Sequence, residues 1–166
     1  MRVRSLLLRG LRIHMKLIAT FPTDRTKLGT LEAFDNRSSR IGSWPCLGKA
    51  DNAMAAKKGN PSRNPERPFG DTPLGEWTVN VGVINKDKST YGPYPVLMLW
   101  PTSGQALDAY KQWKRSGIWI HGGDANAAGQ LRPTYGCIRV SDKAMAELHE
   151  IIKRLGKFTT LETKEG

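Results

Sequence analysis

The amino-acid sequence predicts a mainly β domain, built as a β-sandwich or a curled mixed sheet, with two helices at its edge. Short stretches with the composition of strands, separated by turn residues, account for most of the chain, whereas only two stretches have helical spacing. The 166 residues, 39% of them hydrophobic and 25% charged, suffice for the core of one globular domain. No stretch of the sequence approaches the roughly 18 apolar residues of a membrane span.

The first three predicted strands form a β-meander. Residues 15–21 (MKLIATF) are typical of a strand, and a polar turn follows them. A second strand is predicted over residues 30–35, where Leu31 and Phe34 alternate only loosely, and a tight turn then leads to a third over residues 41–47.

A long proline-rich segment follows, from residue 52 to residue 74. Four prolines fall within it, with two glycines among polar residues. We expect a long ordered loop with little regular structure. Loops of this length in compact domains are usually functional or disordered.

The second half of the chain predicts four more strands. Residues 76–84 alternate strongly and should place four apolar side chains on one face: Trp77, Val79, Val81 and Val83. The near-continuous apolar run over residues 94–100 predicts a buried strand. Residues 117–123 (GIWIHGG) predict a short buried strand that enters a glycine-rich turn, and residues 157–161 predict the last strand.

Two stretches predict helices. Residues 106–115 place Leu107, Tyr110 and Trp113 at helical spacing. The stronger helix runs over residues 141–155, with Ser141 as its N-cap and Gly156 at its C-terminal end. Its apolar stripe comprises Met145, Leu148, Ile151, Ile152 and Leu155.

The chain is strongly basic, with a formal net charge of +11. We predict a basic, disordered arm over residues 1–14 and one domain over residues 15–166. The arm has no recognisable signal peptide, because Arg9 interrupts its leucine run. A basic body favours a polyanion such as nucleic acid, anionic lipid or a wall polymer, with an ordinary solvated surface as the default, and charge alone does not choose among them. The arm contains Arg2, Arg4, Arg9 and Arg12 and no acidic residue.

One cysteine and one histidine stand out as candidate chemistry. Cys137 follows a glycine and precedes the second helix. His121 ends a buried strand, and fifteen residues separate it from Cys137. A thiol becomes an efficient nucleophile when a base takes its proton. His121 is the natural base, since His14 lies in the arm and His149 in mid-helix. The spacing by itself leaves two readings open, a nucleophile–base pair or two packing residues.

Two motifs resemble the signature of the L,D-transpeptidases, the YkuD-like family. The family signature is His-Gly, a variable loop, then Ser/Thr-His-Gly-Cys followed by an apolar residue and Arg or Asn. This chain has IHGG and later PTYGCIRVS, and GDTPLGEW (residues 70–77) resembles the turn that opens a central strand in the family. The resemblance covers roughly residues 15–161. The matching positions are His121, Gly122, Thr134, Gly136, Cys137, Ile138 and Arg139.

The resemblance implies that Cys137 is the nucleophile and His121 its base. Amides around Gly136 and Cys137 could form an oxyanion hole. Thr134 is expected to fix the turn and to orient His121 through its backbone carbonyl, and Gly122 to leave room beside the imidazole.

Two further residues are assigned to substrate binding. Arg139 either holds a substrate carboxylate or braces the loop that carries the nucleophile. Tyr135 stands where the family has the histidine of Ser/Thr-His-Gly-Cys, so it is expected to reshape the donor pocket or to change turnover.

The implied reaction is acyl transfer on peptidoglycan stem peptides. The nucleophile would displace D-alanine from a tetrapeptide stem and form a thioester. A second stem would resolve it by 3→3 cross-linking, or a D-amino acid by exchange. Water as the acceptor would make the protein an L,D-carboxypeptidase. Neither a metal nor an organic cofactor is needed, and carbapenems acylate such cysteines in many family members.

The same resemblance sets expectations for partners and location. We expect a monomer that binds no nucleic acid and acts in the periplasm or cell envelope, with the export route open. A secreted wall-attacking effector with the same Cys/His pair is one alternative. A catalytically inactive homologue that binds the cell wall is another.

The remaining cysteine and the tryptophans have plainer readings. Cys46 is predicted to be a small core residue, with a redox partnership with Cys137 as the alternative. The tryptophans could form a glycan-binding platform, but four of the five fall in strand or helix patterns and are predicted to be core. They are Trp44, Trp77, Trp100, Trp113 and Trp119.

Overall fold

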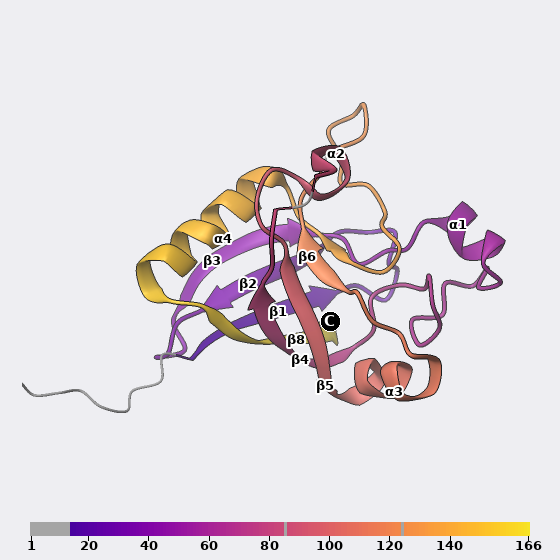
Figure 1. Cartoon of the computed structure of the whole chain (residues 1–166), viewed down its shortest axis with the longest axis horizontal. Coiled ribbons are helices and arrows are strands. Elements are labelled where there is room, and N and C mark those ends of the chain that lie inside the picture. Colours follow the sequence, from indigo (N-terminus) through magenta and orange to yellow (C-terminus); the bar gives the residue numbers. More distant parts are fainter. Residues whose placement is uncertain (1–13, 85, 124) are drawn as a thin grey trace, which may run out of the picture.

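One curled sheet forms the body of the protein (Figure 1). The computed structural model describes residues 14–84, 86–123 and 125–166. The arm predicted over residues 1–14 lies outside the described residues except for His14, which is exposed. The strands are β1 (Met15–Phe21), β2 (Gly29–Phe34), β3 (Arg40–Cys46), β4 (Gly75–Val81), β5 (Leu97–Ser103), β6 (Trp119–His121), β7 (Ile138–Arg139) and β8 (Phe158–Glu165). The prediction of a mainly β fold is confirmed.

The sheet is mixed and has the strand order β3-β2-β1-β8-β4-β5-β6-β7. Two pairs are parallel, β1 with β8 and β6 with β7, and the other neighbours are antiparallel. The C-terminal strand β8 therefore joins the N-terminal meander to the strands that follow it. The first three strands occupy the positions that the sequence predicts.

The two ends of the strand order meet. Just after β3, Leu47 exchanges two backbone hydrogen bonds with Arg139 of β7, at 2.9 and 3.0 Å. Further along, Lys49 and Asp51 bond to the backbone of Thr134. The sheet thus curls almost to closure, and the loop that carries Cys137 lies at the seam.

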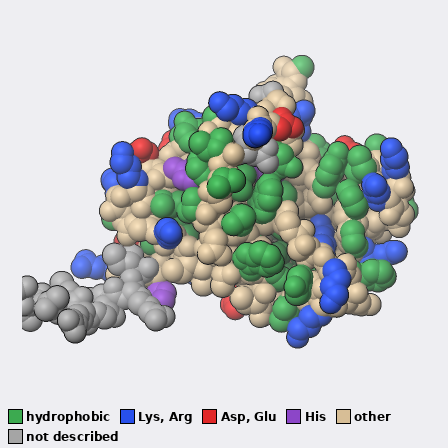
Figure 2. Space-filling model, in the orientation of Figure 1, with side chains coloured by type: hydrophobic (Ala, Val, Ile, Leu, Met, Phe, Trp, Pro, Cys, Tyr) green, Lys and Arg blue, Asp and Glu red, His purple; other side chains and the backbone are tan. Residues whose placement is uncertain are grey.

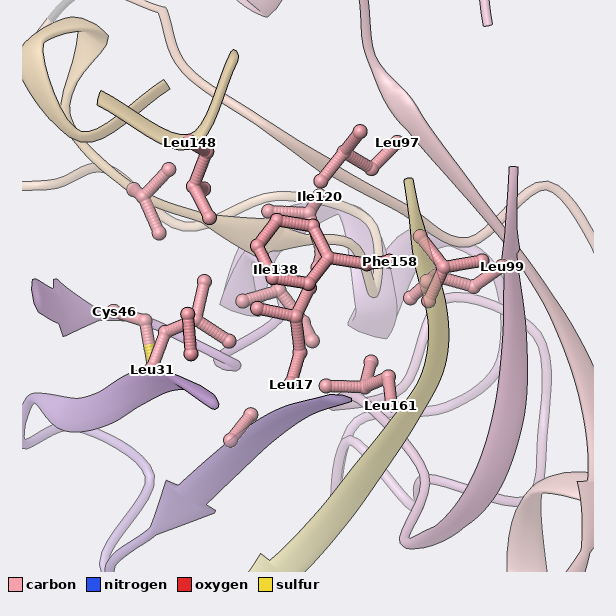
Figure 3. Close-up of a cluster of buried hydrophobic side chains, with 14 of the residues drawn as sticks. Leu17, Leu31, Cys46, Leu97, Leu99, Ile120, Ile138, Leu148, Phe158 and Leu161 are labelled. Carbon is pink, nitrogen blue, oxygen red and sulfur yellow. The ribbon is translucent and has the colours of Figure 1, made fainter. Parts of the chain in front are cut away.

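The core fills the inside of this curl (Figure 3). Strand β1 shows the pattern clearly, because alternate residues are buried and the others are only half-buried. Side chains from most strands and from one helix meet there. Those less than 2% exposed include Phe21, Leu17, Leu31, Leu97, Ile120, Ile138, Met145, Leu148 and Leu161.

The described residues hold four helices, α1 (Asn52–Lys57), α2 (Lys88–Tyr91), α3 (Gly104–Trp113) and α4 (Asp142–Leu155). In α4 the Ser141 hydroxyl accepts from the Ala144 amide at 3.0 Å, and Gly156 ends the helix, as predicted. None of these helices has the length and hydropathy of a membrane span.

Two short helices were not expected from the sequence. Helix α1 begins the segment that we predicted as irregular, because the Asp51 carboxylate caps the amide of Met54 at 2.8 Å. Helix α2 has the same kind of cap, with Asp87 accepting from the amide of Thr90. Sequence reasoning missed the local side-chain cap that stabilises each of these short helices.

The predicted burial of β4 and β5 is partly wrong. Strand β4 ends at Val81, so Val83 is 81% exposed instead of sharing the buried face. Strand β5 begins at Leu97 because Pro93 and Pro95 lack the amide hydrogens that a strand needs. Its outward residue Trp100 is 50% exposed. A run of apolar residues therefore does not show that both faces of the strand are covered.

Helix α3 packs through a different face from the one predicted. Its buried residues are Ala106 and Ala109, whereas Tyr110 and Trp113 are 39% and 40% exposed. Small alanines let the helix approach β4 and β5 closely. The aromatic stripe lies toward solvent.

The α4 cap gives a test of this fold. Ser141→Ala removes the acceptor for the Ala144 amide and should lower the free energy of unfolding by about 1 kcal/mol. Ser141→Asp keeps an acceptor and should retain wild-type stability. Urea unfolding of the three proteins measures the difference, and equal midpoints for Ser141→Ala and the wild type would contradict the role of the cap.

Candidate active site

The parallel pairing of β6 with β7 decides which residues share the functional face. Ile120 lies opposite Ile138, and His121 opposite Arg139. Both isoleucines are fully buried in the core. Because strand side chains alternate, His121 and Arg139 lie on the outer face, and Cys137, two residues before Arg139, lies on that face as well.

His121 and Cys137 line one cleft with a volume of about 940 Å³. The proline-rich segment contributes Pro68 and Phe69 to its wall. Tyr135, which is 58% exposed, packs its ring 5.7 Å from that of Phe69. The fifteen intervening residues therefore loop away and return to the same cleft.

The Cys137 thiol is held by backbone groups. Its Sγ accepts from the Trp119 amide at 3.4 Å and donates to the Gly117 carbonyl at 3.6 Å. Burial raises the pKa of the thiol to about 11, and the Trp119 amide and two nearby arginines oppose that shift only partly. The resting Cys137 side chain is therefore a neutral thiol.

The His121 ring is fixed from two sides. Its Nδ1 lies 2.6 Å from the Gly122 carbonyl oxygen, which makes Nδ1 the protonated nitrogen and leaves Nε2 as an acceptor. Tyr91 packs edge-on against the ring, with centroids 4.9 Å apart. Burial lowers the pKa of His121 to about 4, so the imidazole is neutral and able to accept a proton at pH 7.

The glycine and threonine of the nucleophile loop have roles that differ from those expected. The Thr134 hydroxyl donates to the Cys137 carbonyl at 2.8 Å and accepts from the Gly136 amide at 3.0 Å. The Thr134 carbonyl accepts from Asp51, and it is the Gly122 carbonyl that holds the His121 ring. Because the Gly136 amide is engaged, the oxyanion hole predicted from Gly136 and Cys137 is left with the Cys137 amide, which has no hydrogen bond to another described residue.

Arg139 is a brace for this region. The guanidinium, 3% exposed, donates to the carbonyls of Thr90 at 2.9 Å, Gly122 at 2.8 Å and Arg132 at 2.8 Å. Of the two roles left open by the sequence, these contacts favour bracing. They tie α2 and the loop before the nucleophile to the carbonyl that orients His121.

Sequence reasoning missed Arg115, which lies beside the nucleophile loop. Its guanidinium is 5% exposed and donates to the carbonyls of Pro65, Asp71 and Gly70, the last at 2.5 Å. No carboxylate of the described residues forms an ion pair with it. The positive charge of Arg115 acts to lower the pKa of Cys137 and is available to a thiolate or oxyanion. Only the unusual position of a basic residue just before a buried strand could have signalled it.

The other cysteine is remote from this chemistry. Cys46 is fully buried, its thiol is free like that of Cys137, and burial raises its pKa to about 12. The structure therefore has two free thiols, of which only Cys137 lines the cleft.

Comparison with known families gives a match over most of the chain. The model of the YkuD L,D-transpeptidase catalytic domain matches residues 23–160. The chain belongs to this family. The matched range contains His121, Cys137 and the whole loop between them. The comparison with curated proteins found no match.

A solved structure shows the same fold. It is described as the structure of Bdellovibrio bacteriovorus Bd1075 and superposes with a TM-score of 0.56 at 19% sequence identity. The match covers 91% of the YkuD chain described here and 47% of the other, so this chain spans about half the length of that protein.

The neutral thiol of this YkuD domain predicts a distinctive pH profile. In a Cys46→Ala variant, the alkylation rate of Cys137 with iodoacetamide should rise about tenfold per pH unit from pH 7 to 9, because only the thiolate reacts. No plateau should occur below the thiol pKa of about 11. A plateau already reached at pH 7 would show a preformed thiolate–imidazolium pair and contradict the neutral resting state.

The fit of Gly136 against Arg115 can be tested by adding one methyl group. Gly136 has φ of +123°, and a Cβ there would overlap the Arg115 Nη2 and meet the Gly70 carbonyl oxygen at 3.0 Å. Gly136→Ala should cost roughly 3 kcal/mol of unfolding free energy or more, from backbone strain and displacement of the guanidinium.

Gly129→Ala is the matched control. Gly129 also has a positive φ, +76°, but a Cβ there has open space. It should cost only roughly 1 kcal/mol. If denaturant unfolding gives both variants the same loss, the contact between Gly136 and Arg115 does not constrain the loop.

Proposed function

We propose that this YkuD domain is a cysteine acyltransferase that acts on peptidoglycan stem peptides. Cys137 is the nucleophile and His121 the base. The observation that supports this most directly is that His121 and Cys137 line the same cleft, on the same face of adjacent strands. Two core residues would not need a fixed ring, an open cleft and a buried cation beside the sulfur.

The first half-reaction forms a thioester. Nε2 of His121 takes the proton of the thiol as Sγ attacks the carbonyl between the third residue of the stem and the terminal D-alanine. The Cys137 amide and the Arg115 charge stabilise the developing oxyanion. The proton on His121 passes to the departing D-alanine nitrogen, and the acyl group remains on Cys137.

The second half-reaction releases the acyl group. An amine loses a proton to His121 and attacks the thioester. The amine of a second stem gives a 3→3 cross-link, and that of a free D-amino acid gives an exchanged D-amino acid. Water in the same role gives a trimmed tripeptide. The cysteine thiol is regenerated in each case.

The charge of the cleft suits an anionic stem peptide. Four basic side chains line it, against two acidic ones from Asp51 and Asp87. A tetrapeptide stem brings several carboxylates, so a net positive wall favours its binding. The basic residues are Lys114, Arg115, Arg132 and Arg139.

Three alternatives use the same site differently. Trimming by water would make the protein an L,D-carboxypeptidase. A secreted wall-attacking effector would use the same Cys/His pair on the wall of another cell. Otherwise the protein would act on its own cell's wall, in the periplasm or envelope. The third is a binder without turnover, for which Tyr135 in place of the family histidine is the motivating feature.

Mass spectrometry of stems incubated with purified protein tests the proposal. Cys137→Ala removes the nucleophile, so D-alanine release from tetrapeptide stems should fall to background. Cys46→Ala should keep the wild-type rate, because Cys46 lies in the core. Equal release by the wild type and Cys137→Ala would end the cysteine mechanism.

Tyr135→His addresses the inactive-binder alternative in the same assay. It restores the family residue beside the nucleophile and should change the rate or the ratio of cross-linked to trimmed product. An inert wild type that Tyr135→His revives would instead identify a binder with a disabled site.

A further inference from the structure

One tryptophan on the outer face of the sheet has an uncovered ring. Trp100 of β5 is 50% exposed, and no aromatic ring or cation of the described residues stacks on it. Trp113, by contrast, carries the Arg67 guanidinium 5.0 Å from its ring centre. Hydrophobic side chains gather over β5 on the face shown in Figure 2, between α2 and α3 of Figure 1.

The strand register connects Trp100 to the nucleophile. Met98 lies opposite Trp119, and the Leu99 amide bonds to the Ile118 carbonyl at 3.1 Å, so Trp100 lies opposite Gly117. Trp100 shares the outer face with Met98, two residues away, as does Cys137 on the far side of β6. A single strand therefore separates the indole from the catalytic loop.

Gly117 lies between Trp100 and the Cys137 loop and has no side chain. Its carbonyl accepts from the Cys137 thiol, and a Cβ at Gly117 would meet no atom within 4 Å. Gly117 also lines the cleft, so the residue opposite Trp100 borders the cleft beside the Cys137 thiol.

The separation matches the length of a stem peptide. Neighbouring strands lie about 4.8 Å apart, so two strand spacings place Trp100 about 10 Å from the nucleophile loop. Three extended residues also span about 10 Å. When the third stem residue is at the sulfur, the sugar that carries the stem therefore reaches the position of Trp100.

We infer that Trp100 is the platform of a carbohydrate subsite, which binds the glycan sugar of the stem whose acyl group is transferred. The apolar face of a sugar ring packs on an exposed indole, as apolar groups do on aromatic rings. Thr78 lies opposite Trp100 on β4, and Asn80 two residues further; both are exposed and present groups that hydrogen-bond to hydroxyls. This assignment rests on the proposed acyl transfer for the position of the stem.

The test compares a disaccharide-tetrapeptide with the bare tetrapeptide as donors for D-alanine release. The wild type should show a KM roughly tenfold lower for the disaccharide form, the equivalent of one good aromatic contact. Trp100→Ala should bring the two KM values together, and Trp100→Phe should restore part of the preference. Trp113→Ala is the matched control, because that ring is also exposed, and it should keep the wild-type ratio.

The contrary outcomes are distinct. Equal KM values for both donors in the wild type, or the same loss in Trp100→Ala and Trp113→Ala, would overturn the subsite. A Trp100→Ala defect confined to cross-linking, with the donor preference intact, would also overturn it and assign the ring to the acceptor stem.

A binding measurement separates this inference from the proposed function. Glycan strands stripped of their stems should quench wild-type tryptophan fluorescence and bind Trp100→Ala roughly tenfold more weakly. If the wild type releases no D-alanine but binds these strands through Trp100, acyl transfer fails and the subsite stands. If D-alanine is released but stem-free strands do not bind, the subsite fails alone.

Discussion

The arrangement of the active site depends on the contacts of one buried guanidinium, that of Arg115. Arg115 donates to three backbone carbonyls of the proline-rich segment and lies against Gly136, one residue before the nucleophile. Thr72 of the same segment bonds to the Gly136 carbonyl at 2.8 Å. Two loops that are more than sixty residues apart in sequence are thus held together by one cation and one hydroxyl. Since these carbonyls would otherwise be buried without partners, removing the guanidinium would loosen the loop that carries Cys137.

The same burial that fixes the site also sets its electrostatics. It raises the pKa of Cys137 and lowers that of His121, so each group is neutral near pH 7. Such a pair holds no charge until a substrate carbonyl is present to receive the electron pair of the sulfur. The Arg115 charge then has a partner, which is the thiolate or the oxyanion. In the proposed mechanism, loss of the thiol proton and attack on the carbonyl are therefore coupled.

Much of the fold was accessible to sequence reasoning, where a local pattern agrees with the environment. The alternation of β1 and the Ser141 cap of α4 needed no tertiary information, and the Cys/His pair followed from its motif. The errors in predicted burial share one cause, which is that burial depends on neighbours far along the chain. Ala109 rather than Tyr110 faces the sheet, and Trp100 is half-exposed on the outer face of β5. The role of Arg115 was equally hidden, since all its acceptors come from a distant loop.

The central claim is that Cys137 becomes acylated, and intact-protein mass spectrometry with a carbapenem tests it most directly. The ring-opened antibiotic should add its full mass once per chain, and proteolysis should locate the added mass on the fragment that contains Cys137. His121→Gln should slow the adduct, because no imidazole then takes the thiol proton. An adduct of equal yield on Cys137→Ala, or one located on Cys46, would contradict the assignment of the nucleophile.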